Sequence, residues 1–184
     1  MQPEAFIKKY QDEIIVSTMG TPLLPSVKMA QACLETGYGA SLIGEAKNMF
    51  GIKAAGDKTP YWNGDSVSAG TFEVYSGVQS NITANFRKYK TITDSIRDHS
   101  HLLMTVDRYK PVRQSQTATG QAYALQEAGY ATATNYANTL ISIIDKYDLR
   151  KLDSKKKIMK YVKLSLAIAA LALVVWVIYE QIKY

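Results

Sequence analysis

Hydrophobic residues in the first 150 positions recur mostly three and four residues apart, which is the spacing of amphipathic helices. In the segment 25–35, Val27, Ala30, Cys33 and Leu34 would share one face and pack against a core. The same pattern predicts further helices near residues 3–18, 41–48, 92–107, 117–128 and 133–147. Pro111 and the polar run at 114–119 predict a loop before the later helices. The fold class expected is therefore mainly α (α+β).

The spacing changes between residues 57 and 85, where Gly, Ser and Thr are frequent and short alternating runs appear. In the run from Thr71 to Tyr75, alternate side chains would share a face, so Phe72 and Val74 would pack inward and Glu73 would face the other way. This segment predicts a small β lobe beside the helices. An exposed glutamate in a strand is ordinarily solvated, and the pattern alone gives Glu73 no further role.

A long apolar run near the carboxyl terminus differs from everything before it. Residues 164–179 are sixteen positions without a charge, and they would span about 24 Å as a helix, near the lower limit for a hydrocarbon core of about 30 Å. A core helix of a soluble domain would show a polar stripe, whereas this run is apolar all round. Tyr161, Trp176 and Tyr179 lie near its ends, as interfacial aromatic residues do. We expect a single transmembrane helix at 164–180.

Charge is divided unevenly along the chain. Residues 1–149 carry 14 Lys or Arg and 14 Asp or Glu, whereas residues 150–184 carry 8 basic and 2 acidic side chains and account for the whole net charge of +6. A neutral globular part lacks the basic surface that nucleic-acid binding needs, so we expect no nucleic-acid partner. The segment 150–163 is expected to be a basic juxtamembrane linker that contacts anionic lipid through Lys155, Lys156, Lys157, Lys160 and Lys163.

Glu35 is the acidic residue with the most suggestive position. It falls in the last turn of the predicted 25–35 helix, just before Gly37 and Gly39. The negative end of the helix dipole and the apolar neighbours both disfavour the ionised carboxylate, which suits a proton donor. On spacing alone, a solvated glutamate at a helix end is an equally good interpretation.

Other candidate chemistry is sparse. Cys33 is the sole cysteine, so no internal disulfide is possible, and its apolar position predicts a buried thiol rather than a nucleophile. His99 and His101 are the two histidines, and no Cys or His cluster completes a metal site with them. We expect no metal and no cofactor.

The stretches AQACLETGYG (30–39) and AKNMFGIK (46–53) resemble the signature of the glucosaminidase family of peptidoglycan hydrolases, glycoside hydrolase family 73. Further matches follow in the order of that family: Trp62 with Gly64, Thr71 with Glu73, FRKY at 86–89, SIRDH at 95–99 and GYATATNYANTLISII at 129–144. Together they cover nearly all of residues 4–146, which would make residues 1–149 one glucosaminidase domain.

The resemblance implies a lysozyme-like fold with a helical lobe and a small β lobe. It also implies hydrolysis of the β-1,4 bond on the reducing side of N-acetylglucosamine in peptidoglycan, an endo-β-N-acetylglucosaminidase activity. Glu35 would be the general acid and Glu73 the second carboxylate. Tyr136 would line the groove beside the acid as a catalytic residue whose phenol hydrogen-bonds the acetamido group or the developing charge; a core tyrosine on the last helix is a nearly equal interpretation. Further substrate-binding candidates, from the motifs or as aromatic residues in loops, are Tyr38, Asn48, Trp62, Thr71 and Tyr130.

Several alternatives stay open at this stage. For the second half of the reaction, Glu73 would activate a water, or the 2-acetamido group of the substrate would attack. A muramidase or lytic transglycosylase would share the helical lobe and cleave the same polymer, and a membrane-anchored wall-binding protein would need no catalysis. The basic segment predicts a cytoplasmic domain by the positive-inside rule, although peptidoglycan lies outside. Two arrangements would reconcile a cytoplasmic domain with an external substrate: a phage or prophage lysis enzyme that reaches the wall after the membrane fails, or an exported domain that overrides the rule.

Overall fold

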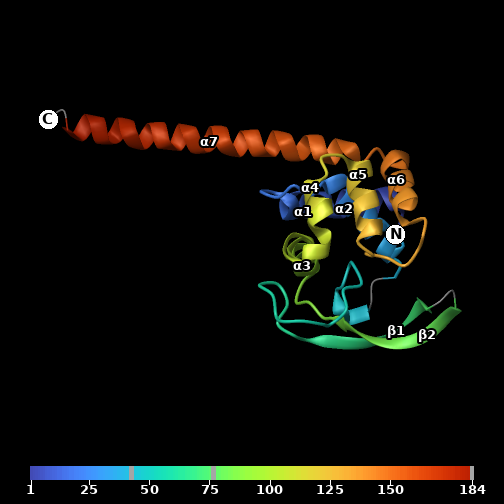
Figure 1. The fold of residues 1–184 in the computed structure, drawn as a ribbon. Coiled ribbons are helices and arrows are strands. Elements are labelled where there is room, and N and C mark those ends of the chain that lie inside the picture. The colour runs from blue at the N-terminus through green and yellow to red at the C-terminus, as the bar shows by residue number, and fades with distance from the viewer. Residues whose placement is uncertain (42–43, 76–77, 183–184) are drawn as a thin grey trace.

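The computed structural model describes residues 1–41, 44–75 and 78–182, and it describes only the backbone of Gly44, residues 71–75 and 78–82, Val177 and Glu180. The described α-helices are α1 Pro3–Thr18, α2 Pro25–Thr36, α3 Ile92–Thr105, α4 Lys110–Gln114, α5 Ala118–Glu127, α6 Tyr136–Lys146 and α7 Arg150–Ile182. Two short 3-10 turns lie at Gly44–Ala46 and Asp107–Tyr109. A hairpin of two strands lies apart from the helices (Figure 1). The prediction of a mainly helical chain with a small β lobe is confirmed.

Helix α2 is the central element of the helical lobe. All nine residues from Pro25 to Cys33 are buried, because α1, α5, α6 and α7 pack around this helix. Phe6 of α1, Leu125 of α5 and Leu140 of α6 are among the fully buried side chains of the surrounding core. Burial on all sides fixes the axis of α2, and this in turn fixes the position of the side chain carried by its last turn.

The end of α2 is set by two glycines. Gly37 adopts the left-handed conformation with φ 53°, and the next amide, of Tyr38, donates to the Cys33 carbonyl at 2.9 Å. Gly39 has φ 83°, and a Cβ at that position would lie 3.1 Å from the ring of Phe6. The chain therefore turns sharply just after Glu35, which remains in the final helical turn as the sequence predicted.

The hairpin is formed by β1 (Ser66–Tyr75) and β2 (Val78–Arg87), which pair antiparallel from Ser66 opposite Arg87 to Tyr75 opposite Val78. Thr71 and Glu73 lie in β1, where their backbones pair with Ile82 and Ser80. Their side chains lie outside the described residues, so the predicted orientation of Glu73 remains a prediction.

Asp98 of α3 joins the base of the hairpin to the helical lobe. Its fully buried carboxylate accepts hydrogen bonds from Arg87 Nη1 at 2.7 Å, from the Tyr89 hydroxyl at 2.7 Å and from Thr59 Oγ1 at 2.6 Å. These donors come from β2, the segment after it and the loop before β1. A buried carboxylate without these donors would carry an uncompensated charge, so the contacts hold the small lobe firmly at this point.

Helix α7 begins on the domain and extends far beyond it (Figure 1). Leu152 is fully buried, and the Asp153 carboxylate accepts from the amide and the hydroxyl of Ser26 at 2.9 and 2.7 Å. Lys156 donates to the carbonyls of Thr21 and Leu23. The part from Arg150 to Trp176 is long and apolar enough to cross a membrane, with a window of mean hydropathy 2.0 that is nowhere buried.

Two local expectations differ from the structure. Instead of a helix at 41–48, the described part of this segment contains the 3-10 turn Gly44–Ala46, while residues 42–43 lie outside the description. The loop predicted at Pro111 was wrong, because Pro111 lies in the first turn of α4. A proline is tolerated there because its missing N–H would have no helical partner. The polar run provides a loop only at residues 115–117.

Candidate active site

Glu35 occupies the last turn of α2 with its side chain largely shielded from solvent. This burial raises the pKa of its carboxyl from the ordinary 4.5 to about 7, and a hydrogen bond from Tyr136 acts in the opposite direction. A carboxyl with this pKa holds its proton in a large fraction of molecules near neutral pH. It can therefore serve as an acid where an ordinary glutamate could not.

Tyr136, the first residue of α6, is the direct partner of that carboxyl. Its hydroxyl donates to Glu35 Oε1 at 3.2 Å and accepts from Gln31 Nε2 at 3.1 Å. The ring is 3% exposed, and burial raises the pKa of the phenol, which keeps its proton as a donor. The structure thus brings together Glu35 and Tyr136, the two residues that the resemblance places beside each other.

Tyr130 supports Tyr136 from the loop after α5. The two rings stack with centroids 5.7 Å apart and planes 25° from parallel. The hydroxyl of Tyr130 lies 3.0 Å from Nε2 of His99, a buried residue of α3. Tyr130 therefore contacts the site through its ring, while its hydroxyl points toward the core.

Tyr38 lies two residues beyond the α2 terminus and is half-buried. It has φ 57°, a left-handed conformation that is uncommon for a residue with a side chain. Its ring makes edge contacts with Phe6, at 6.5 Å between centroids, and with Tyr147, at 5.7 Å. These contacts fix the orientation of the Tyr38 ring, which belongs to the turn just after Glu35, and part of the ring stays exposed.

Asn48 and Trp62 have internal partners that account for their burial. The amide of Asn48 donates to the carbonyls of Ile52 and Arg87 at 2.9 and 3.0 Å, and its oxygen accepts from the Ile52 amide. The indole N–H of Trp62 donates to the Asp65 carbonyl at 2.6 Å, and the Arg87 guanidinium lies 4.2 Å from its ring centroid. A role for either residue in substrate binding stays a prediction.

The separation between Glu35 and the predicted second carboxylate is not defined, because the side chains of Thr71 and Glu73 lie outside the described residues. That separation is the quantity that would distinguish a water-activating base from a direct nucleophile. Activation of a water by Glu73 and attack by the 2-acetamido group of the substrate therefore both stay predictions.

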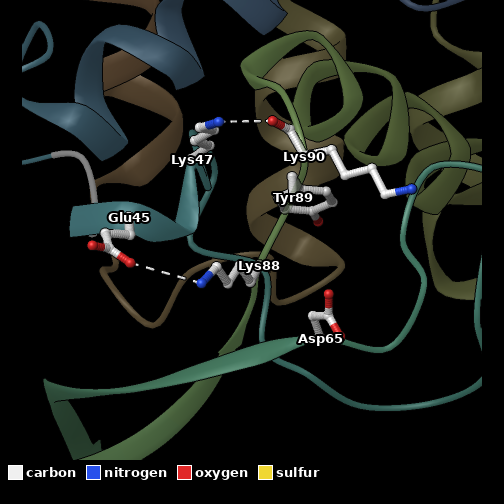
Figure 2. A pocket seen from close by; sticks show the side chains of 6 residues that line it. All are labelled: Glu45, Lys47, Asp65, Lys88, Tyr89 and Lys90. Carbon is white, nitrogen blue, oxygen red and sulfur yellow. Dashed lines mark hydrogen bonds and ion pairs between the residues drawn. The ribbon is translucent and has the colours of Figure 1, made fainter.

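A pocket of about 380 Å³ lies where the hairpin joins the helical lobe (Figure 2). Its lining consists of Glu45, Lys47, Asp65, Lys88, Tyr89 and Lys90. Several of these groups are engaged with one another, since Lys88 pairs with Glu45 at 3.8 Å and Lys47 donates to the Lys90 carbonyl at 2.8 Å. Neither Glu35 nor Tyr136 lines the pocket. The candidate active site therefore rests on the chemistry around Glu35 rather than on this hollow.

Among the described residues, no group of three or more His, Cys, Asp and Glu side chains lies close enough to hold a metal ion. His99 is buried against aromatic rings, and Cys33 is buried in the core with its thiol pKa raised to about 12 by desolvation. Neither side chain is placed as a metal ligand or a reactive nucleophile.

Sequence reasoning gave no role to Lys28, Gln31 or His99, all of which lie behind the site. Lys28, Gln31 and Glu35 follow one another at intervals of three and four residues, so they share a face of α2. That spacing is the sequence signal that could have placed Lys28 and Gln31 behind Glu35. Lysine and glutamine are ordinarily solvated, so the spacing did not suggest that these two side chains are buried.

Comparison with known proteins gives a consistent result. The family model described as glucosaminidase, mannosyl-glycoprotein endo-beta-N-acetylglucosaminidase, matches residues 16–149. The exo-glucosaminidase LytG of Bacillus subtilis is 38% identical over 152 residues, which cover 79% of this chain and 52% of LytG. The peptidoglycan hydrolase FlgJ of Salmonella typhimurium is 40% identical over 121 residues, covering 63% of this chain and 37% of FlgJ. The chain thus spans about half the length, or less, of these relatives.

Solved structures agree with the fold. The catalytic domain of the autolysin Auto from Listeria monocytogenes superposes with a TM-score of 0.70 at 30% identity, covering 82% of this chain and 87% of that domain. The glycoside hydrolase domain of Salmonella typhimurium FlgJ gives a TM-score of 0.63 at 31% identity, covering 80% of this chain and 98% of that one. These matches confirm the predicted lysozyme-like architecture.

Proposed function

This chain belongs to the glucosaminidase family, and from that premise we propose that it is a glycoside hydrolase of bacterial peptidoglycan with Glu35 as its general acid. The observation that carries the proposal is the shielded Glu35 carboxyl, whose pKa of about 7 leaves it a proton to give at neutral pH. Similarity to the peptidoglycan hydrolase FlgJ supports the choice of polymer.

The hydrogen bond from Tyr136 decides which carboxyl oxygen delivers the proton. Oε1 accepts from the phenol, so the acidic hydrogen is carried by Oε2, which transfers it to the glycosidic oxygen as the bond breaks. Glu35 becomes negative as the leaving group is protonated, and the bond from Tyr136 strengthens with that charge. An interaction that is stronger in the transition state than in the ground state accelerates the reaction.

The oxocarbenium-like centre that remains needs a second group. In our proposal Glu73 on β1 activates a water, with substrate-assisted attack by the 2-acetamido group as the alternative. Tyr38, Asn48, Trp62, Thr71 and Tyr130 are the proposed contacts to the glycan. The stereochemistry of the first product, followed by NMR, separates the two routes, because a water-activating base inverts the anomeric centre and substrate assistance retains it.

We assign cleavage to the β-1,4 bond after N-acetylglucosamine, in the interior of the strand. The similarity to LytG, an exo-glucosaminidase, makes an exo mode the specific alternative. Mass spectrometry of borohydride-reduced products from purified cell walls tests this assignment. Reduced N-acetylglucosamine ends are expected. Reduced muramic acid ends would indicate a muramidase, and anhydro ends a transglycosylase. Early release of long fragments would support the endo mode.

The domain organisation is part of the proposal. Residues 1–149 form the catalytic domain, residues 150–163 lie near anionic lipid, and residues 164–180 span the membrane. The apolar, unburied surface of α7 supports this arrangement, as do the exposed Lys155, Lys157, Lys160 and Lys163. The basic segment favours a domain on the cytoplasmic side, as expected of a lysis enzyme that reaches the wall after the membrane fails. Protease added to intact cells should leave the domain uncut, and digestion from outside would reverse the orientation.

A membrane-anchored wall-binding protein without catalysis is the remaining alternative. One measurement separates this alternative from the proposed enzyme: the clearing of purified cell walls by the wild type and by Glu35→Gln. A binding protein would clear neither preparation, whereas the proposed enzyme clears walls only with Glu35 in place.

A further inference from the structure

Lys28 is the most unusual buried group behind the site. Its side chain is 2% exposed, and Nζ makes three contacts: to the Ile96 carbonyl at 2.6 Å, to Ser100 Oγ at 2.6 Å and to His99 Nδ1 at 3.2 Å. None of the three partners is a carboxylate. Placing a lysine here costs desolvation energy, which lowers its pKa well below the ordinary 10.5, while the field of Asp98 acts to raise it.

The hydrogen-bonding inventory of an ammonium group determines the state of His99. In the protonated form that we assign to Lys28, the ammonium has three hydrogens and no lone pair, so all three contacts are donations and Nδ1 of His99 accepts. Burial and the nearby Lys28 charge both lower the pKa of His99, which favours the neutral ring. A neutral imidazole that accepts at Nδ1 carries its hydrogen on Nε2. Nε2 then donates to the Tyr130 hydroxyl at 3.0 Å.

Aromatic contacts hold this imidazole in one orientation. The ring of Phe50 stacks on His99 with centroids 3.9 Å apart and planes 4° from parallel, and Lys28 Nζ lies 5.1 Å from the Phe50 centroid. Tyr130 meets His99 edge to face at 5.6 Å. His99 can therefore exchange its tautomer but has little room to rotate.

The contacts continue without a break to the acid. Tyr130 stacks on Tyr136, and Tyr136 donates to Glu35. Because Lys28 and Glu35 share a face of α2 two turns apart, the path leaves the helix at Lys28, passes through α3, the loop after α5 and the start of α6, and returns at Glu35.

We propose that Lys28 is a positioning residue: it fixes the tautomer of His99 and, through the Tyr130 hydroxyl, fixes the Tyr136 ring that orients the Glu35 carboxyl. The catalytic part of this inference rests on the function proposed above. A purely structural lysine would stabilise the fold without influencing the tautomer or the proton-transfer step. The two roles therefore differ in measurable ways.

The first test is NMR of the full chain in detergent micelles with ¹⁵N-labelled histidine. The chain has two histidines, so His99 and His101 give two sets of ring signals that a His101→Gln variant assigns. In the wild type we expect His99 to be neutral with hydrogen on Nε2. In Lys28→Met the donor to Nδ1 is lost, and the Nε2–H share should fall. A His99 that is cationic or carries hydrogen on Nδ1 in the wild type would overturn the inference, and so would an unchanged tautomer in Lys28→Met.

The second test is kinetic. Lys28→Met should lower kcat on the order of 10-fold with KM within about 2-fold, because the acid is misplaced while the glycan contacts remain. Tyr130→Phe keeps the ring but removes the acceptor, and it should give a similar loss. The double variant should lose little more than either single variant, since both act through one path. If the fold-losses in kcat of the two single variants multiplied in the double variant, the proposed path from Lys28 through Tyr130 would be contradicted. Lys8→Met, on the exposed face of α1, is the matched control and should match the wild type.

These readouts separate two kinds of failure. If Lys28→Met does not fold, the wild-type tautomer and the Tyr130→Phe kinetics still decide the proposal. If the chain hydrolyses no peptidoglycan, the proposed function fails, while the NMR measurement still reports whether Lys28 controls His99.

Discussion

The hydroxyl of Tyr136 lies 3.2 Å from Oε1 of Glu35, although 101 residues separate the two along the chain. The carboxyl terminus of α2 and the amino terminus of α6 are held together by the core, and the phenol bridges them. The bond favours the ionised carboxylate, whereas burial disfavours it, and burial has the larger effect. The acidity of Glu35 thus results from two opposing influences that can be changed separately.

Removing the Tyr136 hydroxyl should make Glu35 a weaker acid and lower kcat. In Tyr136→Phe, the carboxylate loses the bond that stabilises it, so the pKa of Glu35 should rise and the alkaline limb of kcat/KM should move to higher pH. We expect kcat to fall on the order of 10-fold, because the orienting hydrogen bond is lost. The measurement is a pH–rate profile, with Tyr123→Phe, an exposed tyrosine on α5, as control. A limb that moves to lower pH would contradict this reading of the bond.

The wild-type rate should fall as pH rises through about 7. As the proposed general acid, Glu35 would act in its protonated form, and that form declines about tenfold per pH unit above its pKa. The profile should be recorded on purified cell walls at constant ionic strength, since charges on the wall and the basic segment respond to salt. Full activity retained to pH 9 would exclude a general acid with this pKa.

Glu35 should also make the fold less stable at alkaline pH. Its pKa rises from an ordinary 4.5 to about 7 on folding, so the native state binds the proton more tightly and the free energy of unfolding falls as pH rises from 4.5 to 7. The loss is on the order of 1 to 3 kcal/mol and is complete above pH 7. Glu35→Gln lacks this penalty, so it should exceed the wild type in stability by that amount at pH 8.

Urea unfolding of the wild type and Glu35→Gln at pH 4.5 and pH 8 measures the effect, because all other titrating groups are shared. The advantage of the variant should grow between the two pH values. Glu127→Gln, an exposed glutamate of α5, should show no such change. An advantage that is equal at both pH values would mean that Glu35 is not shielded as described.

The base of α7 should contribute to the stability of the domain. Leu24, the residue before α2, provides no side-chain cap, and Asp153 instead accepts from the amide and hydroxyl of Ser26. Asp153→Ala should cost about 1 to 2 kcal/mol and lower Tm by a few degrees. Lys157→Ala, exposed on the same helix, is the control. An unchanged Tm would indicate that α7 is only loosely attached.

Local spacing was sufficient to predict α2 and its end. The apolar positions define one helical face, and Gly37 and Gly39 adopt the positive φ values that stop the helix, so both features are set by nearby residues. The place of Tyr136 beside Glu35 could not be obtained this way, because it depends on how α6 packs on α2. It came from resemblance alone.

The buried polar groups lay beyond sequence reasoning. Lysine and histidine are rarely buried without a charged partner, and the contacts that satisfy Lys28 come from a helix about 70 residues away. The start of α7 is a similar case. The segment 150–163 was expected to be a linker because it is basic, but it is helical throughout, and its first turns pack on the domain through Leu152 and Asp153. The division between domain, linker and span remains a prediction.

The most direct measurement of the central claim is the rate at which wild type and Glu35→Gln release new reducing ends from purified peptidoglycan. Glutamine keeps the shape of the side chain but has no acidic proton to give, so the account predicts a loss on the order of 10²- to 10⁴-fold with wall binding unchanged. Glu127→Gln should keep the full rate. A Glu35→Gln protein that releases reducing ends within a few-fold of the wild-type rate would contradict the assignment of Glu35 as the acid.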